Sequence, residues 1–99
     1  MLPYEERLIS ALTHPVREHR MIAIEVLGRR GYQGAVPAIV KIIETENDYY
    51  IVREAMRALY QIGGPECMAI IASLSRHPSP LVRKYAKSLI QDDPRTNHP

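Results

Sequence analysis

Cysteine and long apolar runs are both scarce in this sequence. Cys67 is the single cysteine among 99 residues, so neither an intramolecular disulfide nor a Cys-rich zinc site can form, which favours a reducing compartment such as the cytoplasm. Its apolar surroundings and lack of a basic neighbour indicate a buried side chain and not a nucleophile. No apolar stretch approaches the roughly 20 residues that cross a bilayer. We therefore expect neither export nor a membrane span.

Motifs of catalysis and of cofactor binding are scarce as well. His14 and His77 each precede a proline and lie far apart in the chain, so we interpret them as turn residues and not as metal ligands. Gly28, Gly31 and Gly34 follow a helical segment instead of joining a strand to a helix, which argues against a phosphate-binding loop. The sequence predicts no enzyme activity, no cofactor and no metal.

What the sequence does contain is a repeat of about thirty residues. Leu27, Leu59 and Leu89 are separated by 32 and 30 residues, and Gly31 and Gly63 by 32. A period of this length indicates stacked units, none of which can bury its apolar face alone. Because 45% of the 99 residues are hydrophobic, the chain has enough apolar material for one domain with a modest core.

Within each period, apolar residues follow the three-and-four spacing of an α-helix, and no alternating strand pattern competes. The predicted buried stripes are Ile22, Ala23, Val26 and Leu27, then Val52, Ala55, Met56 and Leu59, then Val82, Tyr85, Ala86 and Leu89. Glycine and proline breaks divide the chain into six predicted helices, at about 4–13, 16–30, 35–46, 50–62, 65–76 and 79–91. Residues 1–91 then hold three repeats at about 4–30, 35–62 and 65–91, and residues 92–99 form a disordered tail.

Short motifs recur in order at this period. Ile51-Val52-Arg53-Glu54-Ala55, with Ala58-Leu59 and Ile62-Gly63 after it, and the segment 35–40 resemble HEAT repeats of the phycobilisome-lyase type. The resemblance extends over roughly residues 5–91. It implies an all-α fold, a short right-handed α-solenoid of three helical hairpins, in which helices 16–30, 50–62 and 79–91 line the concave face.

The resemblance also implies a ladder in which the arginine of each repeat pairs with an aspartate of the preceding turn. Asp48 is the expected partner of Arg53. The turns before Arg20 and Arg83 offer no carboxylate, so the sequence departs from the family pattern in the first and third repeats.

Formal charge differs between the two predicted layers. The net charge of the chain is only +2, but the concave helices contribute +2, +1 and +3, whereas the convex helices total −2. A face that gathers positive charge favours an acidic partner surface. We therefore predict a protein–protein interaction module, a small adaptor or scaffold that binds an acidic protein. The alternative is that these arginines are structural or simply solvated.

Tyrosine and arginine are over-represented among the contacts that dominate binding energy. The candidate partner-binding residues on the predicted concave face are Arg29, Arg57, Tyr60, Gln61, Lys84 and Lys87. Packing between repeats is an alternative role for Tyr60. Tyr49-Tyr50, at an inter-helix turn, is a further candidate contact patch or a cover for the edge of the solenoid.

Three other functions remain open at this point. Related repeats occur as accessory parts of bilin-attaching lyases, so the resemblance allows an accessory subunit of that kind. The basic face could bind nucleic acid, although only Tyr60 and Tyr85 are aromatic on that layer. A homodimer could form through the C-terminal helix, which no further hairpin covers and whose apolar residues are Leu81, Val82, Tyr85, Leu89 and Ile90.

Overall fold

The computed structural model describes residues 3–93, and this part of the chain contains helices and no strands. The α-helices are α1 (Tyr4–Ala11), α2 (Arg17–Arg30), α3 (Val36–Thr45), α4 (Tyr49–Ile62), α5 (Gly64–Ser73) and α6 (Pro80–Gln91). Two short 3-10 turns, η1 (Gln33–Ala35) and η2 (Leu74–Arg76), precede α3 and follow α5. The predicted all-α class is confirmed. The largest difference in helix bounds is at α5, which gives way to η2 after Ser73 instead of continuing to residue 76.

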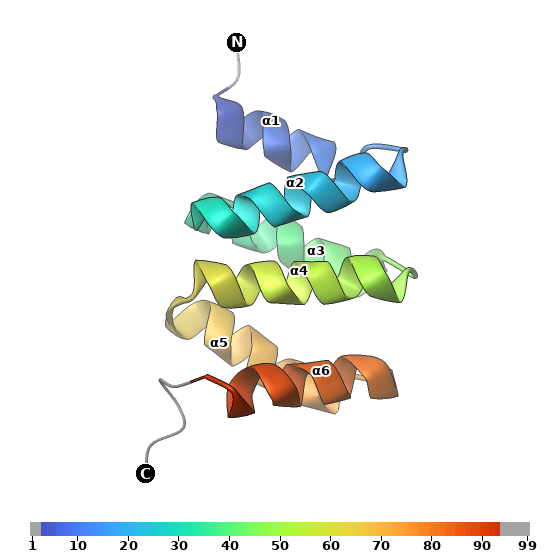
Figure 1. Cartoon of the computed structure of the whole chain (residues 1–99), viewed down its shortest axis with the longest axis vertical. Helices are drawn as coiled ribbons and strands as arrows, with labels where there is room; N and C mark the ends of the chain where they lie inside the picture. The colour runs from blue at the N-terminus through green and yellow to red at the C-terminus, as the bar shows by residue number, and fades with distance from the viewer. Residues whose placement is uncertain (1–2, 94–99) are drawn as a thin grey trace.

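The helices form three hairpins stacked along the long axis of the molecule (Figure 1). Within the hairpins α1 packs on α2, α3 on α4 and α5 on α6, while contacts of α4 with both α2 and α6 join the hairpins. We call α2, α4 and α6 the front layer, because they lie nearest the viewer in Figure 1, with α3 and α5 behind them. Principal extents of 48 × 25 × 17 Å describe an elongated stack, so the predicted solenoid-like arrangement is confirmed.

The apolar core lies between the two layers. The stripe predicted for α4 is confirmed, since Val52, Ala55, Met56 and Leu59 are all buried. The stripe of α2 was predicted one position out of register: Ile22 is 56% exposed, whereas Ile24 is fully buried.

The error in α2 has a physical origin. Its buried face is made of Ala23, Ile24, Leu27 and Gly28. Gly28 contributes close backbone contact but no apolar side chain, so a search for hydrophobic spacing gives it no weight and turns the predicted face toward Ile22.

The predicted helix ends depend on backbone conformation at two glycines. Gly31 ends α2 with φ 62° and ψ 32°, and Gly63 separates α4 from α5 with φ 74°. Both φ values lie in the left-handed region that side chains with a Cβ rarely adopt. At the C-terminal end, the amide of Asp92 donates to Ser88 and Asp93 is buried, so ordered packing extends two residues into the predicted tail. The rest of that tail, 94–99, lies outside the described residues.

The first and second hairpins are in close backbone contact where α2 crosses α4. A Cβ built on Gly28 would stand 2.9 Å from Cα of Ala58, a backbone atom that cannot move aside, and 2.6 Å from Oε1 of Gln61. Ala58 is itself 1% exposed. The first two hairpins therefore approach as closely as they do because position 28 has no side chain.

We expect Gly28→Val to lower the melting temperature, because overpacking at a closed helix contact typically costs about 1–3 kcal/mol. Thermal denaturation followed by circular dichroism measures the effect. Ala69→Val is the matched control, since it places the same branched side chain in a helix at an exposed position of α5. An equal loss of melting temperature in the two variants would contradict the packing argument.

Candidate functional site

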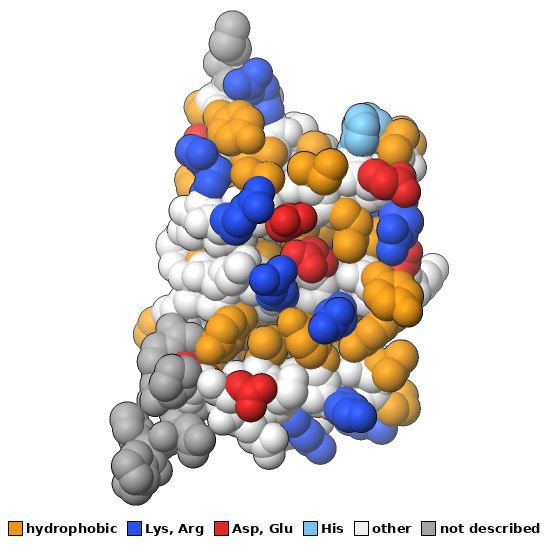
Figure 2. All heavy atoms as spheres, viewed as in Figure 1, with side chains coloured by type: hydrophobic (Ala, Val, Ile, Leu, Met, Phe, Trp, Pro, Cys, Tyr) orange, Lys and Arg blue, Asp and Glu red, His pale blue; other side chains and the backbone are white. Residues whose placement is uncertain are grey.

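The six predicted partner-binding residues all lie on the front layer, whose face is shown in Figure 2. Arg29 is on α2, Arg57, Tyr60 and Gln61 are on α4, and Lys84 and Lys87 are on α6. Tyr60 differs from the others, because it is half-buried and packs against the core, whereas the remaining five side chains are exposed. Whether these residues contact a partner stays a prediction.

Much of the positive charge on this face is matched by carboxylates, and Figure 2 shows basic and acidic side chains interspersed over it. The ion pairs are Arg17–Asp48 at 2.6 Å, Arg20–Glu46 at 3.5 Å, Arg29–Glu25 at 3.3 Å, Arg30–Glu5 at 2.6 Å and Arg57–Glu54 at 3.5 Å. Asp48, Glu46 and Glu5 come from turns or from α1, which is why a charge count restricted to the front-layer helices did not register them.

Within the front layer, the positive charge without a carboxylate partner lies on α4 and α6. Arg53, Arg83, Lys84 and Lys87 form no ion pair with the acidic side chains of residues 3–93. The net positive character of the front layer is therefore concentrated at its C-terminal half.

The predicted pairing of Asp48 with Arg53 is wrong. Asp48 accepts from Nε of Arg17 at 2.6 Å and from the amide of Tyr50 at 2.9 Å, so it joins the first hairpin to the second and caps α4. The Arg17 guanidinium holds the pKa of Asp48 below its usual value. Arg53 instead contacts the ring of Tyr85.

Arg20 and Arg83 bond to backbone carbonyls in place of the absent aspartates. Each donates through Nη1 to both carbonyls of a His-Pro turn, His14-Pro15 for Arg20 and His77-Pro78 for Arg83, at 2.9–3.2 Å. In each turn Nδ1 of the histidine accepts a backbone N–H two residues later at 3.0 Å. This geometry agrees with the interpretation of both histidines as turn residues.

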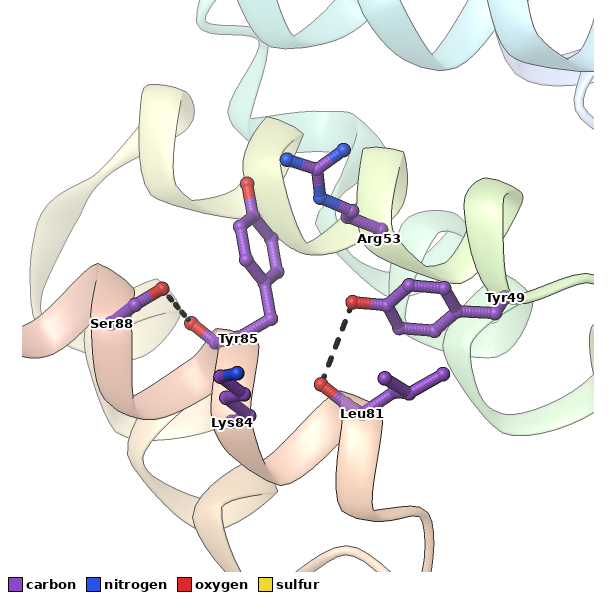
Figure 3. Close-up of a pocket in the computed structure, with 6 residues that line it drawn as sticks. All are labelled: Tyr49, Arg53, Leu81, Lys84, Tyr85 and Ser88. Carbon is purple, nitrogen blue, oxygen red and sulfur yellow. Dashed lines mark hydrogen bonds between the residues drawn. The ribbon is translucent and has the colours of Figure 1, made fainter.

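A hollow of about 310 Å³ opens between α4 and α6, and we call it the α4–α6 groove (Figure 3). Its lining residues are Tyr49, Arg53, Leu81, Lys84, Tyr85 and Ser88. The guanidinium carbon of Arg53 lies 5.0 Å from the centre of the Tyr85 ring, within the range of a cation–π contact. The Tyr49 hydroxyl reaches the carbonyl of Leu81 at 3.5 Å.

Two residues of the groove differ in size from their equivalents in the preceding repeat. Tyr85 stands 30 residues after Ala55, and Ser88 stands 30 residues after Ala58, so each is the third-repeat equivalent of a small residue of α4. Ala55 and Ala58 are buried where α2 and α4 pack closely. At the next junction the phenol ring of Tyr85 occupies the equivalent place of a methyl group, and this ring forms part of the wall of the groove.

Sequence reasoning named Lys84 and Tyr49 as candidate contact residues and Leu81 as part of an uncovered helix face, but it did not bring them together in one groove. It assigned Arg53 to the ladder and Tyr85 to the buried stripe, although Tyr85 is only half-buried. Alignment of Tyr85 with Ala55 at the repeat period was the signal that could have shown a bulky residue at a tight helix contact.

Two ionisable side chains near the core keep their protons. Burial raises the pKa of the Tyr85 phenol above its ordinary value, while the Arg53 and Arg57 guanidiniums act in the opposite direction. Burial also raises the pKa of the Cys67 thiol, which is fully buried in α5. Tyr85 is therefore a neutral hydrogen-bonding group at neutral pH, and Cys67 agrees with the expected small core side chain.

Neither a metal site nor a membrane-spanning helix is found in the described part of the chain. Among residues 3–93, no cluster of three or more histidine, cysteine, aspartate or glutamate side chains is arranged to hold a metal ion. Over the same residues, no helix has both the length and the apolar character needed to cross a bilayer.

Stacked hairpins with a continuous layer of second helices define the class of α-solenoid repeat proteins. The family model for HEAT repeats matches residues 5–91, so the chain belongs to the HEAT-repeat family. HEAT repeats generally mediate protein–protein interactions and typically serve as non-catalytic scaffolds. No curated protein shows significant similarity to the chain.

The Arg17–Asp48 pair gives a testable pH dependence. Because the pKa of Asp48 in the folded chain is below its ordinary value of 3.8, the pair stabilises the fold above that pH and loses its effect as pH falls through the folded pKa. We expect Arg17→Gln to raise the pKa of Asp48 and to weaken the loss of stability in acid, both measured by carboxyl NMR titration with parallel thermal melts.

Arg57→Gln is the control for this experiment. It removes an arginine that pairs with Glu54 and not with Asp48, so the pKa of Asp48 should stay where it is in the wild type. An Asp48 pKa that is the same in Arg17→Gln as in the wild type would contradict the assigned pairing.

Proposed function

We propose that this chain is a protein-interaction module that binds an acidic protein surface with the α4–α6 half of its front layer. Membership of the HEAT-repeat family supports a protein partner. The observation that carries the proposal is the gathering of Arg53, Lys84 and Lys87 on two neighbouring helices, with no ion pair to any carboxylate of residues 3–93. Cations without a local counter-charge steer an acidic partner and pair with it on docking.

The other candidate residues have a supporting role in this proposal. Arg29 and Arg57 are ion-paired, but their side chains are 60% and 53% exposed, so a partner carboxylate can reach them at the rim of the contact. Gln61 is exposed on α4 and adds a neutral hydrogen-bonding group. Tyr60 contributes at most the edge of its half-buried ring.

An adaptor role in the cytoplasm is the biological setting we propose, and it rests on the single buried Cys67 and on the family. No feature of the structure favours an accessory role beside a bilin lyase over any other protein partner. Nucleic-acid binding is disfavoured, because ion pairs neutralise the N-terminal half of the front layer and leave only a short basic surface for a phosphate backbone.

The test is recovery of partners from a lysate of the native host. Bait carrying Lys84→Glu and Lys87→Glu should lose partners that wild-type bait retains, because two attractive charges become repulsive. Quantitative mass spectrometry measures the retention of each protein, and repeating the capture in higher salt should weaken it.

The matched control is Lys41→Glu with Arg76→Glu, which gives the same change of net charge at exposed positions on α3 and η2. Equal retention of partners by the two double variants would show that the front layer is not the binding face. Loss of partners in the control alone would place binding on the opposite layer.

We also propose, as the second candidate, a homodimer through the C-terminal helix. On α6, Val82 is buried and Leu89 and Ile90 are half-buried, which leaves Leu81 as the exposed large apolar residue, at 54%. If the dimer forms, Leu81→Glu should reduce the mass measured by light scattering to that of a monomer. Ile22→Glu, at a residue of similar exposure (56%) on α2, should leave the dimer intact. A monomer mass for the wild type excludes the dimer.

A further inference from the structure

We propose that the α4–α6 groove binds an extended peptide segment of the partner, in which an apolar side chain enters the hollow and an adjacent aspartate or glutamate pairs with Arg53 and Lys84. This inference rests on the proposed function and adds to it the chemistry of the recognised segment. It follows from the size of the groove, the state of its cations and the nature of its walls.

The size of the groove suits side chains and not a whole domain. Its volume of about 310 Å³ is close to the lower limit of ligand pockets, roughly 300 Å³. The hollow lies open on the front layer (Figure 3), so an extended peptide can lie across it with one large side chain inserted.

Arg53 has a fixed position and unused hydrogen-bond donors. It is the one arginine of α2, α4 and α6 that forms neither a hydrogen bond nor an ion pair with the described residues. Its guanidinium is nevertheless held over the Tyr85 ring at 5.0 Å, so less side-chain entropy is lost when a carboxylate binds. Lys84, on the facing helix, supplies a second cation at the same groove.

The walls of the groove favour an apolar residue beside that carboxylate. Tyr49, Leu81 and Tyr85 present two aromatic rings and an aliphatic side chain, of which Leu81 is 54% exposed. Covering these surfaces removes apolar area from water, and the cations at the same site supply orientation.

Charge complementarity selects this occupant over two others. Residues 94–99 of the chain contain no acidic side chain and include Arg95, so their side-chain charge does not match a basic groove. An oligonucleotide can stack a base on the tyrosines, but it carries a phosphate at every nucleotide, whereas Arg53 and Lys84 are the only cations among residues 3–93 that line the groove.

Backbone NMR of the wild-type chain, titrated with unlabelled peptides, tests the proposal. The probes are three short peptides of equal length: one with leucine between aspartates, one with glycine in place of that leucine, and one with lysines in place of the aspartates. An oligouridylate of similar length is titrated in parallel. We expect the leucine–aspartate peptide to shift the amides of Tyr49, Arg53, Leu81 and Tyr85 at millimolar concentration, and the other peptides to bind more weakly.

Variants then separate the charge contribution from that of the hollow. Arg53→Gln should weaken the leucine–aspartate peptide by about fivefold or more, because it removes a charge-assisted pair. Ser88→Leu should do the same by filling the hollow while keeping both cations. Arg76→Gln, which removes the same charge from an exposed position on η2 outside the groove, should change affinity little. Circular dichroism melts confirm that each variant is folded before it is titrated.

Several results would overturn the proposal: no shifts in the groove, equal binding of the lysine peptide, tighter binding of the oligouridylate at the same amides, or equal effects of Arg53→Gln and Arg76→Gln. These results are independent of the lysate experiment. If partners depend on Lys84 and Lys87 but the peptide does not bind, the proposed function stands and the peptide proposal fails. If partner recovery does not depend on Lys84 and Lys87 and the peptide does not bind, the proposed function and the peptide proposal both fail.

Discussion

The structure depends on the packing of α4 between two neighbours. No hairpin of this chain can bury its apolar residues alone, and α4 supplies more buried residues than any other helix of residues 3–93, including Ile51, Met56 and Leu59. At its contact with α2, Gly28 lies against the backbone of Ala58, and at its contact with α6 the groove opens beside Tyr85. α4 therefore meets a very small residue, Gly28, at one neighbour and a large residue, Tyr85, at the other. The groove lies on the side of the large residue.

The fold could be predicted from the sequence because its causes are local and periodic. Leucines about thirty residues apart and glycines at helix ends indicate the number, length and order of the helices before any long-range contact is known. The rotation of α2 could not be predicted in this way. It is set by the closest approach to α4 at Gly28, a residue that a hydrophobic pattern ignores.

The candidate site was less predictable, since it depends on which side chains meet across repeats. Asp48 lies nearer Arg53 in the sequence, yet it pairs with Arg17 of the previous hairpin. This exchange neutralises a cation in the first repeat and leaves Arg53 available in the second. A charge count along single helices gave the correct sign for the front layer, but the location of the excess emerges only when turn carboxylates are assigned to their partners.

Tyr85 has a consequence for how such arrays acquire new surfaces. In a closed globular core, a tyrosine in the place of an alanine must be accommodated by many neighbours at once. In a linear array, each unit touches only the units beside it, so the effect of a bulky residue stays at one junction and the hairpins on either side keep their own packing. A single substitution at one register position can therefore open a recess, and successive repeats can diversify independently while the family architecture is retained.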